Sequence, residues 1–118
     1  MRIRADQLHL FARQQEDAFV QSTARFLARR HAERVGAAGL APDALPQFVR
    51  ETISRGGKHG IVNEPDVRAL CELRLILGPR FETSPQHAPL RAVLEQRDLT
   101  GAQKVDRMYA AMHWCATP

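Results

Sequence analysis

The chain has few of the residues that crosslink small proteins or bind metals. It contains only two cysteines, Cys71 and Cys115, in 118 residues. Neither belongs to a C-x-x-C pair, so a disulfide framework and a cysteine-based zinc site are not expected. The five histidines are scattered, without the H-x-x-x-H or H-E-x-x-H spacing of a metal-binding helix. We therefore expect that the protein holds no metal and no cofactor.

Motifs of enzymatic catalysis are also missing. The sequence has no G-x-S-x-G, no H-R-D and no paired carboxylates on one predicted helix face. The segment GGKHG at 56–60 contains glycines and a lysine, but it lacks the spacing of a phosphate loop and follows a helical pattern. Cys71 lies among leucines, where a cysteine is usually buried and inert. We therefore expect a protein that is not an enzyme.

Long hydrophobic runs are absent. No apolar stretch approaches the roughly 20 residues that a helix needs to cross a bilayer. The first fifteen residues, MRIRADQLHLFARQQ, lack the apolar core and the cleavage site of a secretory signal. We expect no association with a membrane and a cytoplasmic location.

The charge is moderately positive and unevenly distributed. The formal net charge is +4, and residues 1–58 hold ten Lys and Arg against six Asp and Glu. Residues 59–118 hold seven of each sign. Fifteen of the seventeen basic residues are arginine, which base composition of the genome alone can produce. A positive excess of this size more often serves solubility than nucleic-acid binding.

The hydrophobic pattern indicates helices throughout. No stretch alternates apolar and polar residues as a half-buried strand does, so we expect no sheet. Apolar residues instead recur at steps of three and four. We predict an all-α fold, a single domain over residues 1–118 that forms a compact bundle of about five helices. The predicted helices cover residues 6–35, 43–58, 63–77, 85–97 and 98–114, and the last has a capping box in Thr100 and Gln103.

The helix predicted over 63–77 is the most apolar and is expected to be central. Asn63 can cap it, Pro65 suits its first turn, and Asp66 places a negative charge at the positive end of the helix dipole. Its apolar residues run nearly all round the cylinder, as in a helix surrounded by others. Gly78 and Pro79 should end it.

The long first helix carries the candidate partner-binding residues. Its amphipathic stripe includes three phenylalanines, which either fill the core or form an aromatic groove for a partner helix. A cluster of arginines follows near its end, where cations interact favourably with the helix dipole or bind phosphate. The candidate residues are Phe11, Phe19, Arg25, Phe26, Arg29 and Arg30.

Several segments resemble a family of small bacterial helical proteins. These segments are ISRGGKHGI, the turn Pro65-Asp66-Val67 with the apolar helix after it, GPRFETSP, and the closing KVDRMYAAM. Proteins similar to this pattern are encoded in type VI secretion gene clusters, beside spike-tip proteins, toxic effectors and effector chaperones. Some are proposed to act as co-chaperones of effector loading. The resemblance covers about Leu45 to Met112 and, more loosely, the amphipathic first helix, and it implies no catalytic residues.

The expected function is therefore a non-enzymatic, chaperone-like adaptor that binds a secretion effector, its chaperone or a spike protein. An immunity protein that neutralises a cognate toxin is one alternative, although such proteins often present an acidic face and this chain is basic. A helix-turn-helix DNA-binding module is another, with 63–77 as recognition helix. Glu64 and Asp66 would then face phosphates, which is electrostatically unfavourable. The bundle could also form a homodimer through its first helix.

Overall fold

The computed structural model describes the elements of residues 5–116 and the side chains of residues 15–111. Over this part of the chain the secondary structure consists of six α-helices and three short 3-10 helices, without a strand. The all-α prediction is therefore confirmed. The α-helices are α1 (Ala5–Arg30), α2 (Ala32–Ala37), α3 (Leu45–Gly57), α4 (Glu64–Leu77), α5 (Ala88–Glu95) and α6 (Gly101–Ala116). The 3-10 helices are η1 (Pro42–Ala44), η2 (Phe81–Thr83) and η3 (Pro85–His87). None of the described helices combines the length and the apolar character that crossing a bilayer requires.

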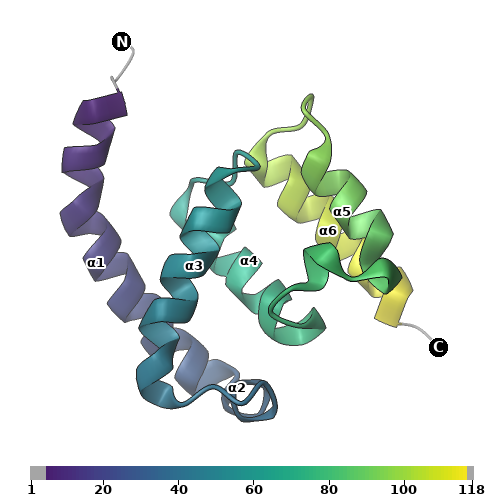
Figure 1. Ribbon diagram of the computed structural model, residues 1–118, viewed down its shortest axis with the longest axis horizontal. Helices are drawn as coiled ribbons and strands as arrows, with labels where there is room; N and C mark the ends of the chain where they lie inside the picture. Colours follow the sequence, from purple (N-terminus) through teal and green to yellow (C-terminus); the bar gives the residue numbers. More distant parts are fainter. Residues whose placement is uncertain (1–4, 117–118) are drawn as a thin grey trace.

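Helix α4 lies in the middle of the bundle, as the sequence predicted. It contacts α1, α2 and α3 on one side and α6 on the other, while α5 packs beside α6 (Figure 1). Six of its residues are buried, and these are Val67, Leu70, Cys71, Leu73, Arg74 and Leu75. Apolar residues on nearly every side allow one helix to pack against neighbours in several directions.

The first helix differs from the prediction at its end. One helix was expected to about Val35, but α1 ends at Arg30 and α2 begins at Ala32. The break is at His31, whose φ of −125° is not helical. The His31 Nε2 lies 2.8 Å from a carboxylate oxygen of Glu72 on α4, and Val35 is buried in the core. Both contacts require the chain to bend toward α4.

The opposite half of α1 leaves the bundle. Figure 1 shows that α3 crosses only the C-terminal part of α1, and that the N-terminal turns extend beyond the other helices. Accordingly, the buried residues of α1 that the structure describes begin at Phe19, followed by Val20, Thr23, Ala24 and Leu27.

The ends of the other helices follow local rules. Gly78, with φ of 119°, ends α4, and Gly60, with φ of 77°, turns the chain between α3 and α4. The predicted capping box is present at the start of α6. The backbone N–H of Gln103 donates to the Thr100 hydroxyl at 3.1 Å, and the backbone N–H of Thr100 donates to Gln103 Oε1 at 2.9 Å. Asn63 occupies the N-cap position of α4, but its side chain makes no capping hydrogen bond.

Candidate functional site

A shallow groove between α1 and α4 is lined by four arginines. It has a volume of about 580 Å³ and is lined by Ser22, Arg25, Phe26, Arg29, Arg30 and Arg68. We call this set the arginine groove. Five of its residues come from two turns of α1, where steps of three and four residues place them on one side of the helix. Arg68 alone comes from α4. The groove therefore exists only because α1 packs across α4.

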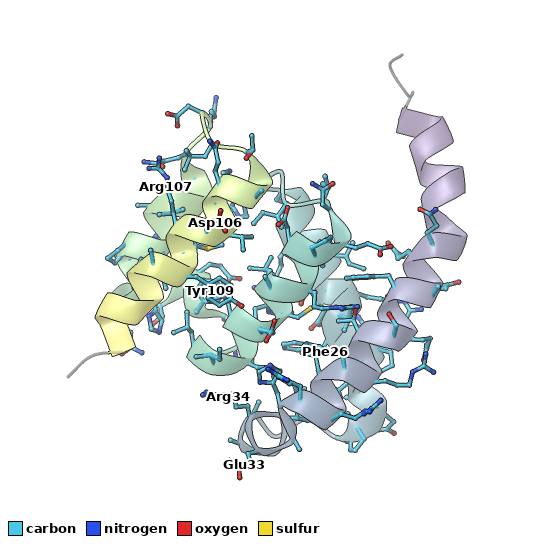
Figure 2. The ribbon with its side chains drawn as sticks, turned by 180° about the vertical axis from the view of Figure 1, so that it is seen from behind. Phe26, Glu33, Arg34, Asp106, Arg107 and Tyr109 are labelled. Atoms are coloured by element: carbon cyan, nitrogen blue, oxygen red, sulfur yellow. The ribbon has the colours of Figure 1, made fainter. Side chains whose placement is uncertain are left out.

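An aromatic contact joins the two helices inside the groove. The Arg68 guanidinium lies 5.1 Å from the centroid of the Phe26 ring, within the range of a cation–π interaction. His31 approaches the same ring edge-on, with centroids 6.1 Å apart. The Phe26 ring is half-buried and packs against the core (Figure 2). The cation–π contact thus places the Arg68 guanidinium over the Phe26 ring.

The positive charge of the groove is not neutralised within residues 15–111, whose side chains the structure describes. Arg25, Arg29 and Arg30 are exposed and Arg68 is half-buried, and none of the four forms an ion pair there. The lining also contains no carboxylate among these residues. The Nε atom of Arg68 is shielded from solvent and has no hydrogen-bond partner in that same part of the protein. Such a surface attracts anions.

The structure brings most of the sequence-predicted residues together, but not all of them. Arg25, Phe26, Arg29 and Arg30 line one groove. Phe19 is only 6% exposed and lies in the hydrophobic core, which agrees with the packing alternative for this residue. The side chain of Phe11 lies outside the described residues, although its backbone belongs to α1. The contribution of Arg68 was not anticipated, because nothing in the sequence pairs it with a residue 42 positions earlier.

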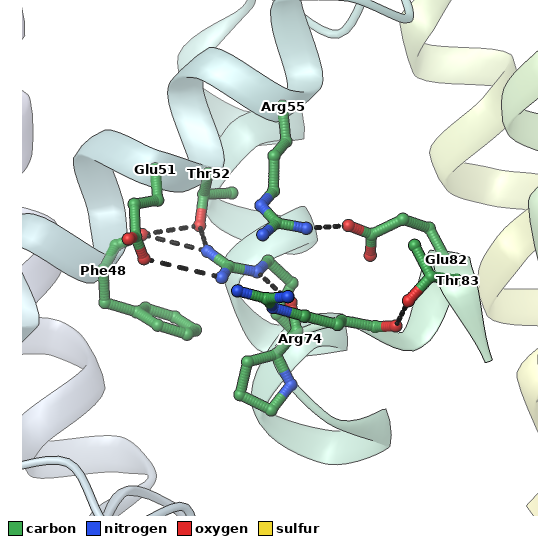
Figure 3. Close-up of polar contacts among 9 residues, drawn as sticks. Phe48, Glu51, Thr52, Arg55, Arg74, Glu82 and Thr83 are labelled. Carbon is green, nitrogen blue, oxygen red and sulfur yellow. Dashed lines mark hydrogen bonds and ion pairs between the residues drawn. The ribbon is translucent and has the colours of Figure 1, made fainter.

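A second polar cluster lies inside the bundle, between α3, α4 and η2. Arg74 of α4 is 2% exposed, and its guanidinium lies 4.2 Å from the centroid of the Phe48 ring (Figure 3). Its Nη1 donates to the Phe48 carbonyl at 3.0 Å and to the Thr52 hydroxyl at 2.5 Å. Its Nε donates to the Pro79 carbonyl at 2.9 Å. Nearby, Arg55 of α3 forms an ion pair with Glu82 of η2.

These contacts satisfy the buried charge rather than expose it. A cavity of about 440 Å³ adjoins the cluster, and both its carboxylates, Glu51 and Glu82, approach arginines. Burial lowers the pKa of Arg74 from its usual value, and nearby Arg55 lowers it further, while Glu51 raises it. Because the donors of Arg74 reach two backbone carbonyls and a hydroxyl, the cluster clamps α3 to α4 and to the connector after α4. We interpret it as structural.

Three further polar or titratable side chains, Lys104, Cys71 and Tyr109, are wholly or partly buried away from the arginine groove. Lys104 of α6 is 5% exposed, and its Nζ donates to the Leu94 carbonyl at 2.7 Å and to the His59 carbonyl at 2.8 Å. Burial raises the pKa of the Cys71 thiol to about 11, which keeps it in the unreactive protonated form. Burial also raises the pKa of Tyr109 to about 12. No group of three or more potential metal ligands occurs among the described residues.

Comparisons of the sequence with protein-family models and with curated proteins, and of the fold with solved structures, found no match. The arrangement of the residues themselves is therefore the basis for a functional proposal.

Proposed function

We propose that this protein acts by binding another protein, as a chaperone-like adaptor in a type VI secretion delivery module. The arginine groove is the observation that supports protein binding most directly. It combines four arginines with a half-buried phenylalanine, and arginine and aromatic residues are enriched where proteins bind one another. The secretion context rests on the family resemblance of the sequence and not on the groove.

The packing of α4 argues against the helix-turn-helix alternative. A recognition helix needs an exposed face that enters the major groove of DNA. In α4, only Glu64 and Pro65 in the first turn are exposed, and every later residue is buried or half-buried. The exposed turn is acidic, so it would be repelled by phosphates. Helix α4 therefore serves the bundle as a core element.

Co-expression tests the proposed function. The protein would be produced together with each product of its neighbouring genes, and complexes would be detected by size-exclusion chromatography with light scattering. We expect a stable complex with an effector, an effector chaperone or a spike protein. Elution without any of these proteins would contradict the adaptor function. The same light-scattering masses report whether the protein forms the homodimer that the sequence left open.

Toxin protection separates the adaptor from an immunity protein. Cells that produce the neighbouring toxin would be grown with and without this protein, in the absence of the other neighbouring proteins. An adaptor is expected to leave the toxicity unchanged. Survival that depends on this protein alone would establish the immunity function instead.

A further inference from the structure

The positive charge of the arginine groove favours a negatively charged partner. Among the described residues, Asp17 pairs with Arg50 and Glu72 pairs with His31, so neither carboxylate forms an ion pair with an arginine of the groove. Four guanidinium groups therefore share one groove with no carboxylate in its described lining. Like charges held this close repel one another, and a ligand with carboxylates would relieve this repulsion.

The spacing of the arginines matches that of a helix. Arg25 and Arg29 are four residues apart on α1, which corresponds to about 6 Å along the axis. Carboxylates four residues apart on a partner helix have the same rise, so that a helix lying along α1 can pair both. Both arginines are exposed and can adjust to a partner.

Arg68 adds a preorganised contact beside this pair. Its guanidinium is held against Phe26 at 5.1 Å, whereas most surface arginines lose considerable side-chain freedom on binding. Its shielded Nε lacks a partner among the described residues. A planar guanidinium held in this way favours a carboxylate in a defined orientation.

We propose that the groove binds an acidic α-helical segment of the partner protein. Carboxylates one turn apart pair with Arg25 and Arg29, and a further carboxylate contacts Arg68. An apolar side chain on the same face of the partner helix covers the exposed part of Phe26. This inference rests on the protein-binding function proposed above, and it specifies the chemistry of the partner.

The contacts around the Phe26 ring favour a peptide rather than a nucleic acid as the ligand of the groove. Proteins that bind single strands stack bases on open aromatic faces. The Phe26 ring is half-buried against the core, has the Arg68 guanidinium over it and is approached by His31 at its side. The Arg68 guanidinium thus occupies a position over the ring that a stacked base would need.

Two synthetic peptides test the proposal directly. Both are fluorescein-labelled, about 20 residues long and alanine-rich so that they form helices. The probe carries glutamates at i, i+4 and i+8 with a leucine on the same face, and the control has the same composition with glutamates distributed around the helix. Fluorescence anisotropy would be measured at about 50 and about 200 mM NaCl. We expect at least about tenfold tighter binding of the probe, corresponding to about 1.4 kcal/mol, and weaker binding at the higher salt.

Charge-reversal variants locate the site. The double variant Arg25→Glu/Arg29→Glu should bind the probe at least about tenfold more weakly, and Arg68→Ala should also lose affinity. The matched control is Arg107→Glu on α6, an exposed arginine that lies far from Phe26 (Figure 2). It should bind the probe as the unaltered protein does. Circular dichroism of each variant checks that the helices are retained.

Three results of the binding measurements would overturn the proposal. They are equal affinity for both peptides, an equal loss in Arg107→Glu, and tighter binding of an anionic DNA duplex than of the probe. A complex with a neighbouring gene product that is unaffected by Arg25→Glu/Arg29→Glu would also overturn it while leaving the adaptor function intact. Conversely, probe binding without any such complex would contradict the adaptor function and support the chemistry of the groove.

Discussion

The guanidinium of Arg74 lies 4.2 Å from the centre of the Phe48 ring and donates to the carbonyl of the same residue at 3.0 Å. One side chain of α4 thus contacts both the ring and the backbone of a residue in α3. Because Arg74 is 2% exposed, its removal would leave the Thr52 hydroxyl and two backbone carbonyls without this donor inside the protein. A buried polar group that loses its hydrogen-bond partner destabilises the folded protein by more than the hydrogen bond had stabilised it.

Arg74→Ala is therefore expected to lower the free energy of unfolding by about 3 kcal/mol, through lost packing and unpaired acceptors. Arg74→Met retains much of the volume and should be destabilised by the lost hydrogen bonds alone. Urea denaturation followed by circular dichroism measures both. The exposed Arg91→Ala on α5 is the control and should change stability by less than about 0.5 kcal/mol. If Arg74→Ala lowered the free energy of unfolding by no more than the control does, Arg74 would not stabilise the packing of α3 against α4.

The capping box and the Arg74 clamp differ in how far the sequence could predict them. Thr100 and Gln103 are three residues apart, so their bonds depend only on local helix geometry. The partners of Arg74 in α3 lie 22 and 26 residues away, and only packing brings them together. In the sequence, Arg74 reads as a polar interruption of an apolar helix. The clamp was therefore not predictable, although the helix that carries it was.

In the candidate site too, local features were predictable from the sequence and features that depend on the packing of distant segments were not. Arg25, Phe26, Arg29 and Arg30 were predicted as candidates from local patterns, Phe26 from the amphipathic stripe and the arginines from their clustering near the end of the helix. Arg68 was missed, since its position beside Phe26 depends on the crossing of α1 and α4. The break at His31 was also missed, because its contact with Glu72 spans 41 residues. Burial of Phe19 was one of two alternatives that the periodicity left open.

Lys104 offers a second test of a buried donor. Its Nζ connects the last turn of α5 and the turn after α3 through the carbonyls of Leu94 and His59. Lys104→Met keeps the aliphatic chain but removes the donor, and we expect a loss of about 2 kcal/mol in the free energy of unfolding. Lys58→Met, at an exposed position, is the matched control and should be nearly neutral. Thermal and urea denaturation of both variants would be compared, and equal stabilities would contradict a structural role of Lys104.

Two glycines with different surroundings test the packing of α6. A Cβ at Gly101 would lie 2.5 Å from the Gly60 carbonyl oxygen and 3.0 Å from the Ile61 Cα. Because the backbone would have to shift, Gly101→Ala is expected to cost about 2 kcal/mol, despite the better helix propensity of alanine. Gly36 of α2 has nothing within 4 Å of such an atom, so Gly36→Ala should stabilise by up to about 1 kcal/mol. Equal stabilisation by both substitutions would show that α6 begins farther from the α3–α4 turn.

The buried thiol of Cys71 should make stability depend on pH in the alkaline range. Its pKa is raised from 9.0 to about 11, chiefly by burial. The unfolded chain therefore releases this proton at lower pH than the folded protein does. The contribution is fully present below pH 9 and is lost as the pH rises toward about 11, at about 1 kcal/mol per pH unit.

Urea denaturation of the unaltered protein and of Cys71→Ala, repeated at several pH values, isolates this contribution. Cys71→Ala should be less stable at neutral pH because a small cavity replaces the sulfur. The difference between the two proteins should shrink as the pH rises from 9 toward about 11. Tyr109 also loses its proton more easily in the unfolded chain, chiefly because burial raises its pKa, and this part of its effect is the same in both proteins and cancels. A constant difference across this range would mean that solvent reaches the thiol in the folded protein, and that the contact between α3 and α4 is looser than the structure shows.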